Sequence, residues 1–528
     1  MPCTSPTPAP ITPFERPSRP ITFHARYCLA RRNTGSPPIL VIAASYPSSS
    51  VAPDYTFLST RIVQLQEHFP HLYVRITGLR TTTPREELRD APWTPGQVLR
   101  EGKYEDKVDR SEELERVLFK EGQRMCGEDV DHRPLWQISV WRNPNKERFY
   151  ITLAADHVIV DGRGLSLLFD ALLCNDISHL PYEKLQDIEL LENTINIKPS
   201  LWYALPRIWQ GHVVDKLPKF FQSFLVPRPS WPGSNIHSNP LDASPDCSML
   251  SISADKISAL KRAAAENHVY TLHPLLKSIF SLAIWSKHHS SISPFRLHAI
   301  TPRSERNPTL GHAFCMANYV SSYNLQVKFG EDGKEGKFYE VTNKMAGELV
   351  DATKLKEARM GMGIMAYIPN KQLIPEASSL SPSSPNKLQK TDRSSTHSTQ
   401  ALLSSADPRA PTTWEHFFLQ TAASVNPYTD ALCFSNIGRA KLPPGADDLA
   451  WSQIAAGVAA AAYSCTVMGH EAGVRIGTIW VEGTAVVREE VKDVERRFMV
   501  IMERLIQGET EVKKLVEKME SSQQQEDA

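Results

Sequence analysis

Hydrophobic and polar positions follow two different periods in the N-terminal part of the chain. Residues 39–46 form an apolar run rich in β-branched side chains, which predicts a buried strand. Residues 111–126 carry apolar positions at helical spacing. Residues 135–141 alternate like a half-buried strand, and 148–157 predict a second strand that pairs with it. Residues 162–173 then place leucines on one helical face, so the pattern predicts a hairpin that leads directly into a helix.

The same mixture of strand and helix signals returns from residue 251. Thr271 is suited to cap a helix, residues 295–303 predict a strand, and residues 488–507 predict an amphipathic helix. Residues 371–412 are rich in Ser, Pro and Thr, a composition that cannot bury enough apolar surface to order a chain. We therefore expect two α/β (α+β) lobes, the second carrying a disordered insertion.

A less regular region separates the two halves. It mixes aromatic side chains, lysines and prolines, and we interpret it as a crossover linker. The alternative is a surface that contacts a membrane, since basic and aromatic amphipathic segments serve both purposes. The expected division is a disordered tail at 1–20, an N-terminal lobe at 21–198, the linker at 199–250, a C-terminal lobe at 251–510 with its insertion at 371–412, and a disordered tail at 511–528.

Composition narrows the class of protein. Of the 528 residues, 41% are hydrophobic and 22% charged, as in globular proteins. Lys+Arg and Asp+Glu both total 59, and this balance disfavours nucleic acid as a partner. The eight cysteines are scattered, and neither they nor the histidines have ligand spacing, so we expect no metal. No signal-peptide core and no membrane-spanning run of about 18 apolar residues is present. We expect a cytoplasmic protein, with peripheral contact to endomembranes or lipid droplets left open.

The candidate chemistry lies where the predicted hairpin meets the helix. His157 ends the second strand, and Asp161 and Gly162 follow at the start of the helix. An imidazole has an unperturbed pKa of about 6.5, which suits a general base at neutral pH. Asp161 is placed to order the loop through an ion pair with an arginine elsewhere, and Gly162 leaves room for a sharp turn or a ligand. The short motif alone fits a structural histidine better than a catalytic one, but its position at a strand-to-helix junction favours catalysis.

The run ITLAADHVIVDGRGLSLLFDALL resembles the catalytic segment of the chloramphenicol-acetyltransferase-like superfamily. This superfamily includes fungal alcohol acetyltransferases, wax ester synthases and the condensation domains of peptide synthetases. Further blocks match in the same order, namely Pro134-Leu135-Trp136, Trp231-Pro232-Gly233, Thr301-Pro302-Arg303 with Gly311, and Ser435-Asn436-Ile437-Gly438. Asp156 stands where many relatives have a second histidine, and the plant family's Asp-Phe-Gly-Trp-Gly block is absent. The Ser-Asn block favours the fungal alcohol acetyltransferase branch.

The resemblance implies two similar chloramphenicol-acetyltransferase-like lobes, with mixed sheets covered by helices and an active-site tunnel between them. It implies a monomeric acyltransferase that takes acetyl-CoA as co-substrate, has no bound cofactor, and acetylates a small-molecule alcohol. By this resemblance His157 is the general base, and Asp161 belongs to the catalytic motif and pairs with Arg303. Ser435 and Asn436 would line the tunnel or stabilise the oxyanion.

Three alternatives stay open on the sequence alone. The acceptor could be an amine, which would make the protein an N-acetyltransferase. The donor could be a thioester on a carrier protein, as in a condensation-like enzyme. Finally, the same fold could serve as a non-catalytic binding protein, although the intact motif at His157 argues against this.

Overall fold

The structure is a computed structural model, and every structural statement below concerns the residues that it describes. These are 17–50, 53–103, 110–127, 130, 132–142, 148–212, 231, 243–288, 297–306, 316–329, 336–374, 407–423, 428, 430–454, 461–517 and 519. Most of the predicted tail at 1–20 and most of the predicted insertion at 371–412 lie outside them, as does Gly311.

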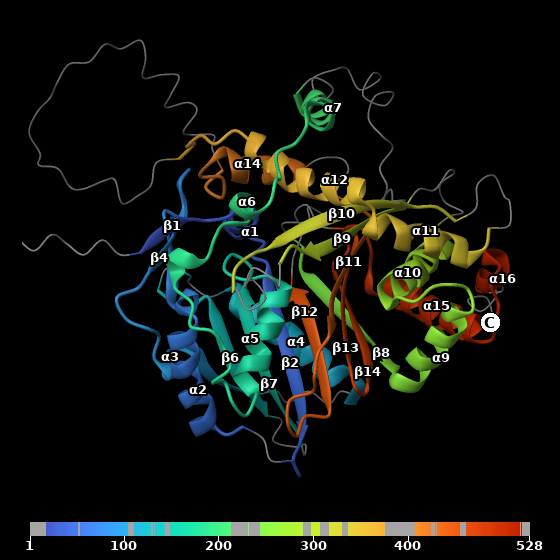
Figure 1. Ribbon diagram of the computed structural model, residues 1–528, viewed down its shortest axis with the longest axis horizontal. Helices are drawn as coiled ribbons and strands as arrows, with labels where there is room; N and C mark the ends of the chain where they lie inside the picture. Colours follow the sequence, from blue (N-terminus) through green and yellow to red (C-terminus); the bar gives the residue numbers. More distant parts are fainter. Residues whose placement is uncertain are drawn as a thin grey trace, which may run out of the picture.

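The N-terminal half is built on a five-stranded sheet with the order β12-β2-β7-β6-β5 (Figure 1). Its strands and helices are β2 (Ile39–Pro47), β5 (Leu99–Lys103), β6 (Trp136–Arg142), β7 (Arg148–Asp156), β12 (Asp448–Ile454), α1 (Phe23–Asn33), α2 (Tyr55–His68), α3 (Pro95–Val98), α4 (Arg110–Cys126) and α5 (Gly162–Leu173). Strands β6 and β7 form the predicted antiparallel hairpin, and α5 has the predicted bounds.

Residues 39–44 of strand β2 are all apolar because both faces of the strand are covered. Ile39 and Val41 pack in one hydrophobic cluster with residues of α4. Leu40 and Ile42 point to the opposite face and pack in a second cluster with residues of α2 and α5. Successive side chains of a strand alternate between faces, so two covered faces require a continuous apolar run. The five-stranded sheet is therefore the central layer of the N-terminal half, with helices packed on both of its faces.

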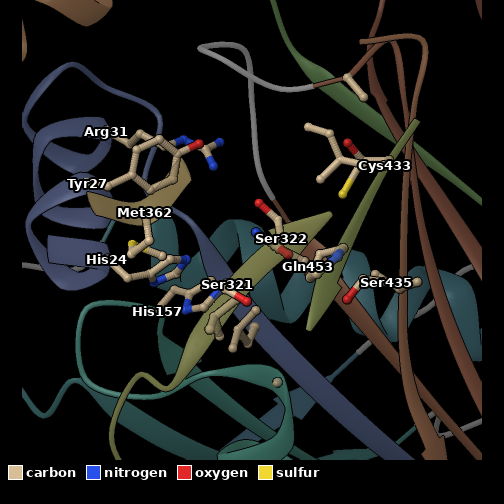
Figure 2. A pocket seen from close by; sticks show the side chains of 18 of the residues that line it. His24, Tyr27, Arg31, His157, Ser321, Ser322, Met362, Cys433, Ser435 and Gln453 are labelled. Atoms are coloured by element: carbon tan, nitrogen blue, oxygen red, sulfur yellow. The ribbon is translucent and has the colours of Figure 1, made fainter. Parts of the chain in front are cut away.

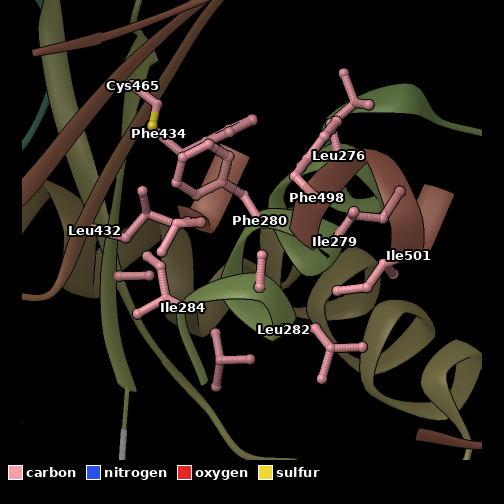
Figure 3. Packing of buried hydrophobic residues seen from close by; sticks show 14 of the residues in the cluster. Leu276, Ile279, Phe280, Leu282, Ile284, Leu432, Phe434, Cys465, Phe498 and Ile501 are labelled. Atoms are coloured by element: carbon pink, nitrogen blue, oxygen red, sulfur yellow. The ribbon is translucent and has the colours of Figure 1, made fainter. Parts of the chain in front are cut away.

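The C-terminal half is built on a six-stranded sheet with the order β10-β9-β11-β13-β14-β8. Its elements are β8 (Pro245–Ser253), β9 (Leu297–Ser304), β10 (Val320–Val327), β11 (Leu432–Arg439), β13 (Tyr463–His470), β14 (Gly473–Val481), α9 (Ala254–Ala265), α10 (Leu272–His288), α11 (Phe338–Val350), α12 (Ala352–Gly363), α14 (Thr413–Ala422), α15 (Arg488–Ile506) and α16 (Val512–Val516). Figure 3 shows the core between this sheet and helices α10 and α15, where Phe280 of α10 packs against both Phe434 of β11 and Phe498 of α15.

Smaller elements connect these two halves and cover their edges. They are β1 (Ser18–Pro20), β3 (Val74–Thr77), β4 (Arg85–Leu88), η1 (Pro70–Tyr73), η2 (Leu185–Asp187), α6 (Leu191–Thr194), α7 (Leu201–His212) and η7 (Ile364–Tyr367). Strands β1, β4 and β3 form a third, three-stranded sheet.

Strand β12 joins the two halves. It comes from the C-terminal part of the chain but pairs antiparallel with β2 in the N-terminal sheet. Trp451 of β12 also donates its indole N–H to the carbonyl of Val467 in β13, at 2.9 Å, and Thr466 donates back to the carbonyl of Trp451. The two sheets therefore meet along β12, and the lobes share a strand instead of being separate consecutive units.

The structure moves two of the expected boundaries. Strand β8 begins at Pro245, inside the predicted linker, because it forms the last strand of the C-terminal sheet. The predicted tail at 511–528 was wrong at its start, since α16 buries Val512 and Leu515 in the core of the C-terminal half. Among the described residues, no helix is long and apolar enough to cross a membrane.

Candidate active site

His157 follows the last residue of β7 and begins the loop that leads to α5. Its backbone N–H donates to the carbonyl of Pro38, at 3.0 Å, which continues the pairing of β7 with the β2 side of the sheet. The side chain is buried, and this burial lowers the pKa of His157 below 6.5, although Asp161 acts in the opposite direction. The imidazole is therefore neutral near pH 7, as a general base must be.

Asn318 fixes the ring of His157. The Asn318 Nδ2 group donates to the backbone carbonyls of His157 and Val158, at 2.8 and 2.9 Å. Its Oδ1 atom must then accept the hydrogen bond that joins it to His157 Nδ1, at 3.1 Å. Carbonyl oxygens accept only, so this network places a hydrogen on Nδ1 and leaves the Nε2 lone pair of His157 as the basic site.

Asp161 orders the loop, but through a different arginine from the expected one. Both carboxylate oxygens accept from Arg306, at 2.7 and 2.6 Å, and the backbone N–H groups of Gly164 and Tyr319 donate to the same carboxylate at 2.8 Å. Burial alone would raise the pKa of Asp161, but Arg306 and these hydrogen bonds hold it below its usual value. Asp161 is thus an ionised N-cap of α5 that ties the loop at 157–161 to the C-terminal half.

The predicted pairing of Asp161 with Arg303 was wrong. Arg303 instead forms an ion pair with Glu305 and donates to the Tyr323 hydroxyl, at 2.9 Å. Ile300 and Pro302 line the central pocket, so the alternation of β9 turns Arg303 toward the other face. Arg306 lies beyond the end of β9, where the alternation of the strand no longer sets the direction of its side chain.

Asp156 occupies the position of the expected second histidine and supports the loop from the other side. Its carboxylate accepts from the backbone N–H of Val158, at 2.9 Å, and from Arg32 of α1, at 2.6 Å. An ion pair thus connects the start of the loop at 157–161 to α1, the helix that supplies one wall of the pocket. Asp156 is a structural residue here.

A pocket of about 310 Å³ lies between the two halves, with His157 in its wall (Figure 2). This volume is at the lower end of the range for small-molecule sites. The described wall comes from α1, β2, the loop at His157, the start of α5, strands β9 to β13, α12 and η7. Its members include His24, Tyr27, Arg31, Leu40, Gly162, Ile300, Pro302, Val320, Ser321, Ser322, Gly361, Met362, Met365, Cys433, Ser435, Trp451, Gln453, Ser464 and Thr466. A pocket therefore lies around His157, between the two halves, where the resemblance places an active-site tunnel.

Gly162 and Ser435 both line this pocket, but Asn436 does not belong to its described lining. A Cβ atom on Gly162 would come within 3.1 Å of Ile437 and Trp451, so glycine permits the close approach of α5 to β11 and β12. Asn436 follows Ser435 on β11 and points to the opposite side, where its Oδ1 accepts from the N–H of Gly438. The expected role of Asn436 at the oxyanion has no support in this geometry.

His24 of α1 is a second histidine beside His157. Its ring centroid lies 4.7 Å from that of His157, and its Nδ1 atom lies 3.7 Å from the thiol of Cys28 (Figure 2 labels both histidines). Burial and then the neighbouring His157 lower the pKa of His24 to about 3, so it is neutral. Ligand atoms of His24, Cys28 and His157 lie within 4.8 Å of one another, and within the described residues these are the side chains that could converge on a metal ion.

Two of the other matched blocks are packing residues. Trp136 is buried and donates its indole N–H to the carbonyl of Leu72, at 2.7 Å. Trp231 is also buried and packs edge-on against His288 and Tyr463. Neither lines the pocket described above.

The functional residues that the sequence did not reveal are Asn318, Arg306 and His24. Asn318 stands 161 residues from His157, and Arg306 stands 145 residues from Asp161. Helix and strand periodicity relates only residues that are close in the sequence, so it could not pair these positions. A histidine in the first turn of an early helix, four residues before a cysteine, was the one signal available for His24.

Comparison with known proteins supports the fold. No family model and no curated protein matches this chain. Among solved structures, the condensation domain of the monacolin K polyketide synthase MokA has a TM-score of 0.57 at 8% identity, covering 94% of this chain and 99% of that one. The EpoB cyclization-docking bidomain from Sorangium cellulosum has a TM-score of 0.55 at 14% identity, covering 96% and 88%. The epimerization domain from the third module of tyrocidine synthetase B has a TM-score of 0.54 at 12% identity, covering 93% and 96%. The chain therefore has the two-lobed fold of condensation domains, which is shared with acyltransferases of the chloramphenicol-acetyltransferase type.

Proposed function

We propose that the protein is an acyltransferase that moves an acyl group, most simply acetyl from acetyl-CoA, to the hydroxyl of a small-molecule alcohol. One observation carries the proposal: a neutral His157, with its Nε2 lone pair left free by Asn318, lies in the wall of a pocket between the two halves. A histidine that served only to fill space would not need a dedicated amide to select its tautomer.

The reaction follows from this arrangement. His157 Nε2 accepts the hydroxyl proton while the acceptor oxygen attacks the thioester carbonyl carbon. The tetrahedral intermediate collapses with cleavage of the C–S bond, and the imidazolium returns the proton to the leaving thiolate. The products are an ester and a free thiol, and the base is regenerated. Ser435, whose side chain lines the pocket, is a candidate donor to the oxyanion, and such a donor can contribute several kcal/mol to the transition state.

The pocket suits an alcohol acceptor with a substantial apolar portion. Its described lining includes eight apolar side chains, among them Ile300, Met362 and Trp451, against six that bear a hydroxyl group. Burial keeps His157 and His24 neutral, which leaves Arg31 as the charged side chain in the described lining of the pocket. The assignment to the fungal alcohol acetyltransferase branch rests on the Ser-Asn block and on these features.

The test compares wild type with His157→Ala and with Asn436→Ala. Purified protein is incubated with acetyl-CoA and a panel of alcohols and amines, and the acylated product is quantified by mass spectrometry. We expect ester formation that falls by about 100-fold or more in His157→Ala, within the range that a general base contributes. Asn436→Ala, a change outside the pocket, serves as the matched control and should keep the wild-type rate. Full activity of His157→Ala would refute the proposal.

A condensation-like enzyme is the second candidate, because the similar solved structures are condensation, cyclization and epimerization domains. In that case the donor would be an acyl group held as a thioester on a carrier protein. Supplying the same acyl group on coenzyme A and on a phosphopantetheinyl carrier protein separates the two functions. A rate at least about tenfold higher with the carrier would favour the condensation-like function. No turnover with either donor would leave a non-catalytic binding protein.

A further inference from the structure

Two polar side chains face the central pocket where the two sheets meet. Gln453 lies on β12 and Ser464 on β13, and both line the pocket. A hydrogen bond from Thr466 to the carbonyl of Trp451, at 3.0 Å, joins the two strands, and Gln453 and Ser464 each stand two residues from it. Figure 2 shows Gln453 across the pocket from His157. We refer to Gln453 and Ser464 as the polar pair.

The hydrogen-bonding groups of the polar pair are not used by the protein itself. Within the described part of the chain, no side-chain hydrogen bond holds either residue. Other hydroxyl groups of the wall are already bonded, since Ser321 donates to Glu305, at 2.6 Å, and Thr466 donates to a backbone carbonyl. A polar group that loses water without gaining a partner is destabilising. A ligand that fills this side of the pocket therefore needs a polar group of its own.

The register of the N-terminal sheet fixes how far Gln453 stands from His157. Gln453 pairs with Leu40 of β2, and Leu40 pairs with Ala155 of β7. Gln453 and His157 are thus two strands and two residues apart, or roughly 12 Å at spacings of about 4.8 Å between strands and about 3.4 Å along a strand. Leu40 stands between them and also lines the pocket. A ligand that reaches both side chains therefore has two polar ends and an apolar middle.

The polar pair suits a neutral hydroxyl group. An amide and a serine hydroxyl can each donate and accept, and so can the hydroxyl of a ligand, whereas a carbonyl only accepts. The described lining contains no acidic side chain, and its charged side chain, Arg31, lies over the ring of Tyr27, with 5.6 Å between the guanidinium carbon and the ring centre. A charged ligand group at the polar pair would lose water without meeting an opposite charge, which is unfavourable.

We propose that Gln453 and Ser464 bind a hydroxyl group, and that the acceptor is an alcohol with a second hydroxyl at the far end of an apolar skeleton. The second part rests on the proposed acyltransferase function, because it names the class of acceptor. The first part does not, since it concerns binding alone. One hydroxyl would then react at His157 while the polar pair holds the other, so Gln453 determines specificity and takes no part in proton transfer.

Ligand binding in a His157→Ala background tests the polar pair without turnover. The probes are terminal diols from butanediol to decanediol, each compared with the monohydric alcohol of the same length by ligand-observed NMR. We expect Gln453→Leu to lower the ratio of diol affinity to alcohol affinity at least about fivefold, as loss of a hydrogen bond predicts. Gln326→Leu, the same change at an exposed position of β10 outside this pocket, is the matched control and should keep the ratio.

A shorter amide distinguishes a specific contact from a disturbed pocket. Gln453→Asn keeps the amide but withdraws it by one methylene group, so the preference for diols should return with a longer diol as the best ligand. Thermal unfolding of each variant checks that the protein is folded. An unchanged affinity ratio in Gln453→Leu, or no binding of any diol to the folded protein, would overturn the proposal.

Steady-state kinetics with His157 intact separate the acceptor from the donor. With acetyl-CoA as donor, Gln453→Leu should lower kcat/KM for the diol relative to the monohydric alcohol at least about fivefold and leave the KM for acetyl-CoA unchanged. A raised KM for acetyl-CoA, with all acceptors affected equally, would show that the amide contacts the donor, and this would overturn the proposal. If diol binding depends on Gln453 but no acceptor is esterified, the acyltransferase function fails and the hydroxyl site stands.

Discussion

Replacing Asn318 by alanine removes the group that selects the tautomer of His157. In the structure Asn318 accepts from Nδ1 at 3.1 Å and holds the backbone of the catalytic loop through two more hydrogen bonds. Without it, the ring can rotate or carry its hydrogen on Nε2, where the base is needed. Loss of one hydrogen bond, about 0.5–1.5 kcal/mol net, sets a lower limit of a few-fold on the decrease in kcat/KM. The whole rate enhancement that a general base contributes, about 10²–10⁴-fold, sets the upper limit on that decrease. We therefore expect kcat/KM to fall by about 10- to 1,000-fold.

Aspartate at the same position separates the two roles of Asn318. Asn318→Asp keeps an acceptor for His157 Nδ1 but loses both hydrogen bonds to the carbonyls of His157 and Val158. It should therefore retain more activity than Asn318→Ala. The new negative charge also favours the imidazolium form, so it raises the pKa of His157. The acid limb of the pH profile of kcat/KM should accordingly move to higher pH, whereas in wild type it lies below pH 6.5 because burial lowers that pKa.

Initial rates of ester formation between about pH 5 and pH 8 provide the measurement, and thermal unfolding of each variant provides the stability control. The residual rates of His157→Ala and of the double variant His157→Ala/Asn318→Ala complete a double-mutant cycle. Because Asn318 acts through His157, the second change should cost almost nothing in the His157→Ala background. A loss as large as in wild type would refute this reasoning, as would equal activity and identical pH profiles for the alanine and aspartate variants.

Three further outcomes are expected. Arg306→Ala leaves a buried carboxylate without its partner and should lower the free energy of unfolding by about 3–5 kcal/mol in urea titrations, with Arg306→Lys recovering part of the loss; an unchanged midpoint would contradict the ion pair. Burial lowers the pKa of His273 to about 3 and that of His288 to about 4, so at these two groups the unfolded chain takes up protons first, and their contribution to stability should fall as the pH drops below about 6.5, by up to about 1.4 kcal/mol per pH unit and group. Burial raises the pKa of Glu115 and Glu183 to about 7, and these carboxyls act in the opposite direction. Calorimetry at about pH 7 and pH 5 therefore compares wild type with His273→Gln/His288→Gln, which should lose less stability, and an equal change in both proteins would contradict this. Finally, added Zn²⁺ should inhibit transfer reversibly, because Cys28 and the two active-site histidines offer converging ligand atoms. Cys28→Ala should weaken that inhibition, and an unchanged inhibition constant would exclude the site.

The local elements around the active site follow from the hydrophobic pattern. The apolar run at β2, the alternating hairpin of β6 and β7, and the leucine face of α5 each encode which of their sides is buried. The position of His157 at the end of β7 then follows, since strand and helix signals meet there. Local periodicity was sufficient because each of these elements buries its own face whatever its partner is.

The pairing of side chains across the site could only come from the folded chain. Asn318 and Arg306 reach the catalytic loop from more than a hundred residues away, and strand β12 completes a sheet whose other members are all N-terminal. The sequence of β12 has no feature that names β2 as its neighbour, because backbone hydrogen bonds are the same for every strand. Likewise Arg303 and Arg306 are equivalent cations in the sequence.

The sequence by itself determined the fold class, the strand-end position of His157 and the loop role of Asp161. Tertiary structure decided which arginine neutralises Asp161, which amide orients His157, and that His24 lies beside it. The physical reason is the range of the forces involved. Burial of apolar faces leaves a period in neighbouring residues, whereas hydrogen bonds and ion pairs act over a few ångströms between residues that only the packed chain brings together.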